Sequence, residues 1–299
     1  MLIPPLSRTL SRTLSRTVSR TLSRTLSRKR GSESVIKERF SYQNLRVYED
    51  MIQAISLGEE IASGWDSVHA ITDHFARASE GALLCFAESS RKRQTPARTE
   101  ALGHGLGSIL ECAACFDIST CKSRVSQEKC NEVKTMLSSV FRQLYALRRS
   151  WQCEGALQLR ERAVEYGESA VFHHEGLKTY QLALQVNRDI ASWRFVERLP
   201  RSDFRRIDEA ATSIVLNIAE GNGRFAHLDH SRFLDIANQA TTKAAARLEI
   251  SAIRGRISSD EADKLVRLLV QIDNMTAKLA SVWKEKQERE AGIRRMKNI

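Results

Sequence analysis

Two short patterns in the sequence place potential metal ligands about one helical turn apart. Cys112 and Cys115 form a C-x-x-C pair, and His227 and His230 have the same spacing with Asp229 between them. A structural zinc site usually needs four ligands, often as two such pairs, and carboxylate bundles carry a second pair on a facing helix. The sequence shows no second cysteine pair and no facing histidine pair. We therefore interpret the cysteines as core residues and predict no metal site and no cofactor.

The residue orders of familiar hydrolases are also missing. The sequence has no nucleophile elbow, no H-E-x-x-H and no recognisable Ser, His and Asp order. Its six cysteines come without a convincing signal peptide, which is typical of reduced thiols in a cytosolic chain. We predict a cytoplasmic protein that is not an enzyme.

A glycine-containing stretch, SIVLNIAEGNGR at residues 213–224, poses the question of a phosphate-binding loop. A dinucleotide fingerprint needs a third glycine, and the positions after Gly223 are Arg, Phe and Ala. Apolar residues before the glycines recur every three or four positions, as on one face of a helix. We interpret Gly221, Asn222 and Gly223 as a helix-stop turn in which a glycine adopts positive φ.

Charge is distributed unevenly along the 299 residues, whose formal net charge is +11. Residues 1–40 contain ten Lys and Arg against only Glu33 and Glu38, so most of the excess lies there. No stretch reaches 18 uninterrupted apolar residues, and we expect no membrane-spanning helix.

The N-terminal arm, residues 1–40, repeats a unit of the type LSRT. A period of four residues does not match the 3.6-residue helical period, so no stable apolar stripe forms and we expect disorder. Three interpretations stay open: a cationic arm that contacts nucleic acid or an anionic membrane, an organelle transit peptide, or a translated and tolerated DNA repeat.

The remaining sequence is similar to itself at a shift of 132 residues. This shift places Tyr48 on Tyr180 and Trp151 on Trp283, and it holds without gaps from residue 45 to residue 151. A long internal repeat of this kind indicates two structural units of the same architecture. We interpret the pattern as an old tandem duplication.

Each copy divides into four helical segments. In the second copy they are residues 176–196, 204–221, 227–254 and 258–288. The last segment has a heptad seam with alternating spacings of three and four, which consists of Ala262, Leu265, Leu269, Ile272, Thr276, Leu279 and Trp283. Four helices with short loops favour an up-down-up-down bundle. We predict an all-α fold of two tandem four-helix bundles after the low-complexity basic arm: arm 1–40, first bundle 41–151, partly helical linker 152–173, second bundle 174–290.

The second copy resembles a known family through SIVLNIAEGNGR and the RFLDIA of residues 232–237. This is the family of four-helix bundle proteins of the 23S rRNA intervening sequence, which is related to the accessory variability determinant of diversity-generating retroelements. The first copy carries the other signature of the family, GSILECAACFD at residues 107–117. Each copy departs from the pattern: the first has ESSR at residues 88–91 in place of the glycine turn, and the second has Gln239, Ala240 and Lys243 in place of Gly, Ser and Glu.

The resemblance implies a bacterial-type bundle protein that forms homo-oligomers and binds RNA or DNA together with a polymerase-type protein. In an up-down-up-down bundle the loop between the second and third helices shares one pole with the start of the first helix and the end of the fourth. That pole would carry the candidate phosphate contacts, which are Arg91, Lys92, Arg93, Arg98, Arg224 and Arg232. We predict a nucleic-acid-binding accessory protein; the alternative is an oligomerising interaction scaffold with no nucleic-acid role.

Overall fold

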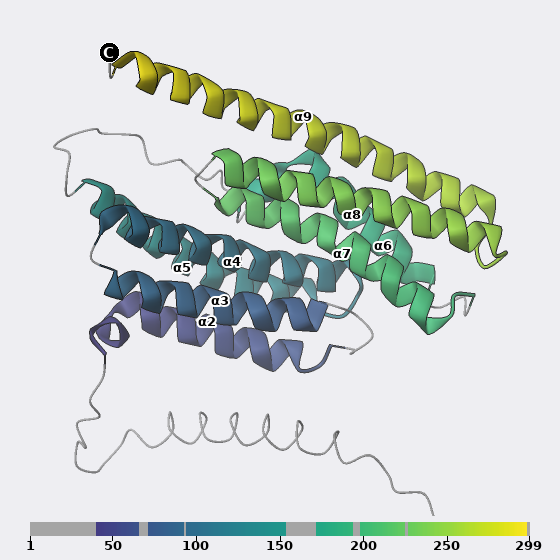
Figure 1. Ribbon diagram of the computed structural model, residues 1–299. Coiled ribbons are helices and arrows are strands. Elements are labelled where there is room, and N and C mark those ends of the chain that lie inside the picture. Colours follow the sequence, from purple (N-terminus) through teal and green to yellow (C-terminus); the bar gives the residue numbers. More distant parts are fainter. Residues whose placement is uncertain are drawn as a thin grey trace, which may run out of the picture. The chain divides into compact units, whose positions relative to one another are not determined.

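The computed structural model describes residues 40–65, 71–92, 94–153, 172–193, 198–224 and 227–297. In chain order the elements are η1 (Ser41–Asn44), α2 (Arg46–Ala62), α3 (Ile71–Arg91), α4 (Thr95–Cys121), α5 (Gln127–Cys153), η2 (His173–Gly176), α6 (Lys178–Trp193), α7 (Arg201–Gly223), α8 (His227–Ile253) and α9 (Ser259–Lys297). All regular structure within these ranges is helical (Figure 1), so the predicted all-α class is confirmed. The predictions for the arm and for most of the linker concern residues 1–39 and 154–171, which lie outside these ranges.

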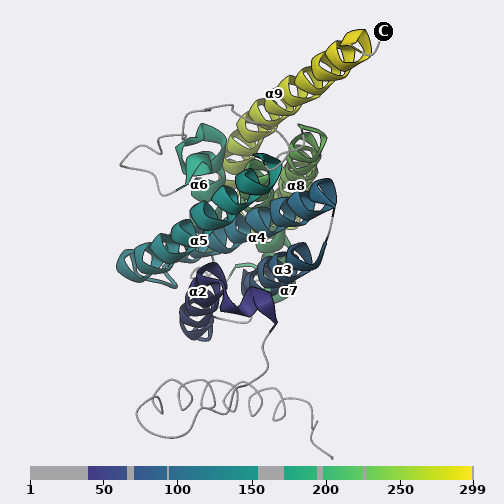
Figure 2. The same cartoon turned by 90° about the vertical axis from the view of Figure 1, so that its left-hand side faces the viewer.

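Helices α2 to α5 form one ring of neighbours, and α6 to α9 form another. In the first ring α2 contacts α3, α3 contacts α4, α4 contacts α5, and α5 contacts α2. The second ring repeats this order with α6, α7, α8 and α9. Figures 1 and 2 show the two sets of roughly antiparallel helices, with α9 extending well beyond α8 at its C-terminal end.

The heptad seams lie in the cores of these rings. Leu269 and Ile272 of α9 are fully buried, as are Val133 and Val140 of α5. A three-and-four spacing keeps such residues on one face of a helix, which must be covered for the helix to be stable in water. The seam predicted from spacing for α9 is therefore correct at Leu269 and Ile272, and α5 has buried residues at the corresponding positions.

The two rings join through α4, which packs against α7 and α6. Buried residues from both rings form one continuous apolar cluster, and residues 41–299 make a single compact unit. Helix α4 is consequently buried on several sides, and Cys112 and Cys115 lie fully inside it, as expected for core cysteines.

Element boundaries in the two rings correspond at the shift of 132 residues. Helix α4 begins at Thr95 and ends at Cys121, and α8 begins and ends 132 positions later. Even the turns correspond, because Ser123 after α4 has φ of 54° and Gly255 after α8 has φ of 66°. In both turns the residue that follows the positive-φ position donates a backbone hydrogen bond five residues back, as in a Schellman motif.

Helix α7 ends at the predicted glycines, as expected, but without a positive-φ turn. Helix α7 continues through Gly221 and Asn222 and ends at Gly223, and among the described residues the glycine with positive φ is Gly255. The expectation of positive φ at Gly221 to Gly223 was therefore wrong. These glycines are needed for close helix packing instead.

Candidate functional site: the junction between the bundles

Helices α4 and α7 approach each other very closely at two glycines, Gly107 and Gly223. A Cβ atom on Gly223 would lie 2.7 Å from the Cα of Gly107 and 2.9 Å from its nitrogen. Contacts this short with backbone atoms leave no space for any side chain at residue 223. Gly221 has a similar role toward α8, where an added Cβ would meet the Cβ of Phe233 at 3.1 Å. The sequence reveals the glycines, but only the packed helices reveal why they are there.

Charged side chains lie directly beside the glycine contact. Arg224 and Glu220 form an ion pair at the end of α7, and their side chains are only 12% and 17% exposed. The Arg224 guanidinium lies over the Phe233 ring, 4.7 Å from its centroid. A Cβ on Gly107 would touch Arg224 Nε at 3.1 Å, so the glycine also admits this side chain.

Glu111 approaches the same place from α4. Its Oε1 atom lies 3.3 Å from Nδ1 of His74 on α3, and both side chains are about one-fifth exposed. Burial raises the pKa of Glu220, Arg224 opposes that rise, and Glu111 adds to it. Residues of the GSILE stretch in the first copy thus meet residues of the EGNGR stretch in the second copy, across the junction.

A buried ion pair joins the same two helices further along. Lys122 Nζ donates hydrogen bonds to Asp208 Oδ1 at 2.5 Å and to Thr212 Oγ1 at 3.1 Å. Asn187 of α6 extends this cluster by donating to the Ala211 carbonyl at 2.8 Å. Burial lowers the pKa of Lys122, and Asp208 opposes that effect. A shifted register would separate these two opposite charges while both stay buried, so the pair disfavours other registers of the junction.

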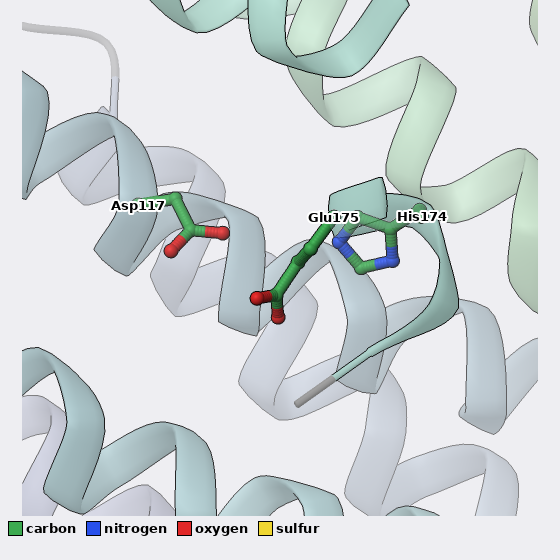
Figure 3. A group of neighbouring side chains, drawn as sticks. All are labelled: Asp117, His174 and Glu175. Atoms are coloured by element: carbon green, nitrogen blue, oxygen red, sulfur yellow. The ribbon is translucent and has the colours of Figure 1, made fainter. Parts of the chain in front are cut away.

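A second polar cluster links α4, α5, η2 and α6. Asp117 accepts hydrogen bonds from Lys134 Nζ at 2.6 Å and from the Tyr180 hydroxyl at 2.8 Å. Lys134 also lies 2.9 Å from Glu175 Oε1. Figure 3 shows Asp117 directed from its helix toward Glu175 and His174, which belong to η2.

Asp117, His174 and Glu175 have ligand atoms within 4.8 Å of one another, close enough to surround a metal ion. However, the Lys134 ammonium already bridges the two carboxylates. Burial lowers the pKa of Lys134, but the two carboxylates outweigh it, so the pKa is raised and the ammonium persists. A metal ion would have to displace this internal cation, so we interpret the group as a structural ion-pair network.

The residues predicted to contact phosphate have different environments. Arg98 stacks on Trp151, with its Cζ 3.6 Å from the ring centroid, and Lys92 pairs with Glu88 at 2.9 Å. Arg91 and Arg232 are exposed, whereas Arg224 is engaged at the junction as described above. Arg93 lies outside the described residues. The role of these residues in binding nucleic acid stays a prediction.

Neither the Lys122–Asp208 pair nor the cluster around Asp117 was predicted from the sequence. Lys122 and Asp208 are 86 residues apart, and Asp117 and Tyr180 are 63 apart. The histidine pair is also clarified in part: His230 is buried with its ring 4.2 Å from that of Trp283, and the His227 side chain lies outside what the structure describes.

The geometry defines an all-α protein made of two four-helix rings with a tightly packed junction. Residues 175–278, which span most of the second ring, match the model of the family described as 23S rRNA-intervening sequence protein. No curated protein and no solved structure matches the chain significantly. Among the described residues, every helix is too short or too polar to cross a membrane.

Proposed function

We propose that the chain is a non-enzymatic, RNA-associated accessory protein. The family match over residues 175–278 carries this proposal, since the family is described by an intervening sequence of ribosomal RNA. The resemblance in the sequence adds two finer elements, a polymerase-type protein partner and a homo-oligomeric state. The formal net charge of +11 favours a polyanionic ligand.

The thiol environments support a role without covalent catalysis. Burial raises the pKa of Cys112 and Cys115 well above the usual value, so these thiols stay protonated and are poor nucleophiles. The five cysteines whose side chains the structure describes are free, which favours a reducing compartment such as the cytoplasm.

Phosphate contact would depend on exposed cations rather than on the buried ones. Arg91 and Arg232 are exposed to solvent, whereas Arg98 and Arg224 contact Trp151 and Glu220. Lys92 would exchange its partner Glu88 for a phosphate, which costs little because such an i,i+4 pair is weak.

The test measures binding of a fluorescent single-stranded RNA and of a DNA of the same sequence to the full chain at several salt concentrations. Binding should weaken steeply with salt, and replacing Arg91, Lys92 and Arg93 by Gln should weaken it about equally for both probes. The control replaces three bases of α9, Lys264, Arg267 and Lys278, by Gln, which removes the same charge elsewhere. Equal losses in both triple variants would mean that net charge alone attracts the RNA, and absence of binding would overturn the proposal.

One observation favours the alternative, an oligomerising interaction scaffold. The Gly107–Gly223 contact is a bundle-to-bundle surface kept free of side chains, so association between bundles is already a property of this chain. Under this alternative the full chain self-associates in the absence of nucleic acid, which sedimentation velocity measures directly.

A further inference from the structure

The surface of α7 that packs on α4 has a counterpart on α3. The stripe on α7 consists of Asp208, Thr212, Leu216, Glu220 and Gly223, all buried or half-buried. The shift of 132 residues relates them to Ala76, Glu80, Leu84, Glu88 and Arg91 of α3. All five of these are exposed. Helix α3 therefore presents to solvent the surface that α7 uses inside the junction.

The opposite surface of the junction has its counterpart on α8. On α4 and the residue that follows it, the stripe consists of Gly107, Leu110, Glu111, Ala114, Ile118 and Lys122. The equivalent residues of α8 and the following turn are Gln239, Thr242, Lys243, Ala246, Ile250 and Arg254, and all six are exposed. Helix α8 thus leaves open the surface that α4 buries.

Both open surfaces keep large apolar residues. Leu84 of α3 is 59% exposed although its equivalent Leu216 is buried. On α8, Ile250 is 44% exposed although its equivalent Ile118 is fully buried, and the neighbouring Ile253 is 85% exposed. Exposed apolar residues that gather at the positions of a known contact indicate an interaction surface.

The charges on the two open surfaces are complementary. Lys243 of α8 takes the place of Glu111, and Glu88 of α3 takes the place of Glu220. The Glu111–Glu220 repulsion of the junction would become an attraction between Lys243 and Glu88. In the same register, Arg254 takes the place of Lys122 and Glu80 takes that of Thr212, which gives a second pair of opposite charges.

We propose that α8 of one copy of this chain binds α3 of a second copy, head to tail, in the way that α4 binds α7 within the chain. This inference deepens the scaffold alternative by naming the two faces. The junction within the chain is not two-fold symmetric, since α4 packs extensively on α7 while α8 and α3 form no comparable contact in the described part of the chain. A contact of this kind is heterologous and can continue from copy to copy.

The contact between copies must be looser than the one within the chain. Arg91 and Gln239 occupy the positions of Gly223 and Gly107, where an added Cβ would lie 2.7 Å from backbone. The helix axes therefore lie further apart, and we expect association that depends on concentration.

The experiment is sedimentation velocity of the full chain over a concentration series at low salt. Leu84→Asp and Ile250→Asp should each raise the dissociation constant by about tenfold or more, because each places a charge in the contact. The control is Val270→Asp on α9, where the parent residue is 51% exposed on a different helix. It should self-associate like the parent.

Charge exchange tests the head-to-tail arrangement. Lys243→Glu and Glu88→Lys should each weaken self-association, whereas an equimolar mixture of the two variants should associate again, because the acid introduced on α8 of one variant then meets the base introduced on α3 of the other. If the parent chain self-associates but the face variants and their mixture behave like the Val270→Asp control, this inference is wrong and the scaffold alternative stands. If the parent chain stays monomeric throughout the series, both are wrong.

Discussion

The Nζ atom of Lys122 lies 2.5 Å from Oδ1 of Asp208, and each side chain is only 1% exposed. The pair connects the end of α4 with the first half of α7, so it spans the two bundles. Removing one member leaves the other charge buried without the opposite charge of this pair, which is more damaging than losing an attraction in water.

Asp208→Leu and Lys122→Met should therefore each lower the free energy of unfolding by about 3–5 kcal/mol, measured by denaturant titration. The double variant should recover much of this loss, because the buried ammonium and the buried carboxylate are then removed together. Lys284→Met serves as the control: Lys284 lies 3.0 Å from Asp235, but the side chains are 51% and 45% exposed, and we expect a loss of about 1 kcal/mol or less. A single-variant loss as small as that of the control would contradict a structural role for the buried pair.

Gly223→Ala should destabilise the junction through steric conflict. The new Cβ would lie 2.7 Å from Gly107 Cα, and neither backbone can yield without moving a helix. We expect a loss of about 1–3 kcal/mol, in the range of other overpacked sites. Gly292→Ala is the matched change, because this helical glycine has nothing within 4 Å of an added Cβ, and it should stabilise by roughly 0.5–1 kcal/mol. Thermal unfolding of both variants measures these changes. A Gly223→Ala variant as stable as the parent would disprove the close contact.

Substitutions at the two equivalent turns, Ser123→Gly and Gly255→Ala, should change the free energy of unfolding in opposite directions. Ser123 has φ of 54° and carries a side chain in a backbone region that favours glycine. Ser123→Gly should raise the free energy of unfolding by about 0.5–1 kcal/mol, since the relief of strain exceeds the entropy that glycine adds to the unfolded chain. Gly255→Ala should lower it by about 1 kcal/mol for backbone reasons alone, as nothing lies within 4 Å of an added Cβ there. Equal signs in the two unfolding experiments would contradict the left-handed turns.

His174 makes stability depend on pH. Burial lowers its pKa to about 3, with Lys134 and His173 adding to the effect, so the folded protein keeps this ring neutral. The unfolded chain binds a proton at the ordinary value of 6.5. The contribution of His174 to the free energy of unfolding is therefore fully present above pH 6.5. It is lost as the pH falls from 6.5 toward 3, by about 2 kcal/mol between pH 7 and pH 5.

His174→Phe should remove this part of the pH dependence. Neither ring nitrogen has a hydrogen-bond partner among the described residues, and the ring packs edge-on against Tyr180 with centroids 4.7 Å apart, so an apolar ring fits the site. Unfolding at pH 5 and pH 7 should show the smaller difference for the variant. An unchanged difference would mean that other groups set the acid sensitivity.

Helix positions and core seams could be predicted because they follow from local spacing. The register of α9, with Leu269 and Ile272 inside, follows from counting three and four along the chain. The junction could not be predicted in this way, because a glycine near a helix end has two explanations. A positive φ and a close helix contact both require glycine, so the sequence alone does not tell the two apart. The contact of Gly223 with Gly107 on another helix shows that close packing is the reason here.

The same limit applies to charges. Arg98 and Arg224 look like exposed phosphate contacts in the sequence, yet one stacks on Trp151 and the other pairs with Glu220. The sequence did not indicate that Lys134 and Asp117 form an ion pair. They lie on two different helices, so no spacing along one helix relates them.

The placement of Gly107 and Gly223 in a single polypeptide also affects how the two halves can diverge. Two bundles joined by a linker meet at a high effective concentration, so their contact forms in every molecule at any dilution. A contact that is always formed needs its glycine on only one helix of each half, and the equivalent helices are released from that requirement. Arg91 and Gln239 stand at those released positions. Covalent linkage thus lets each half keep its glycine on one helix only, while the corresponding helix of that half can carry a charged or polar side chain at the same position.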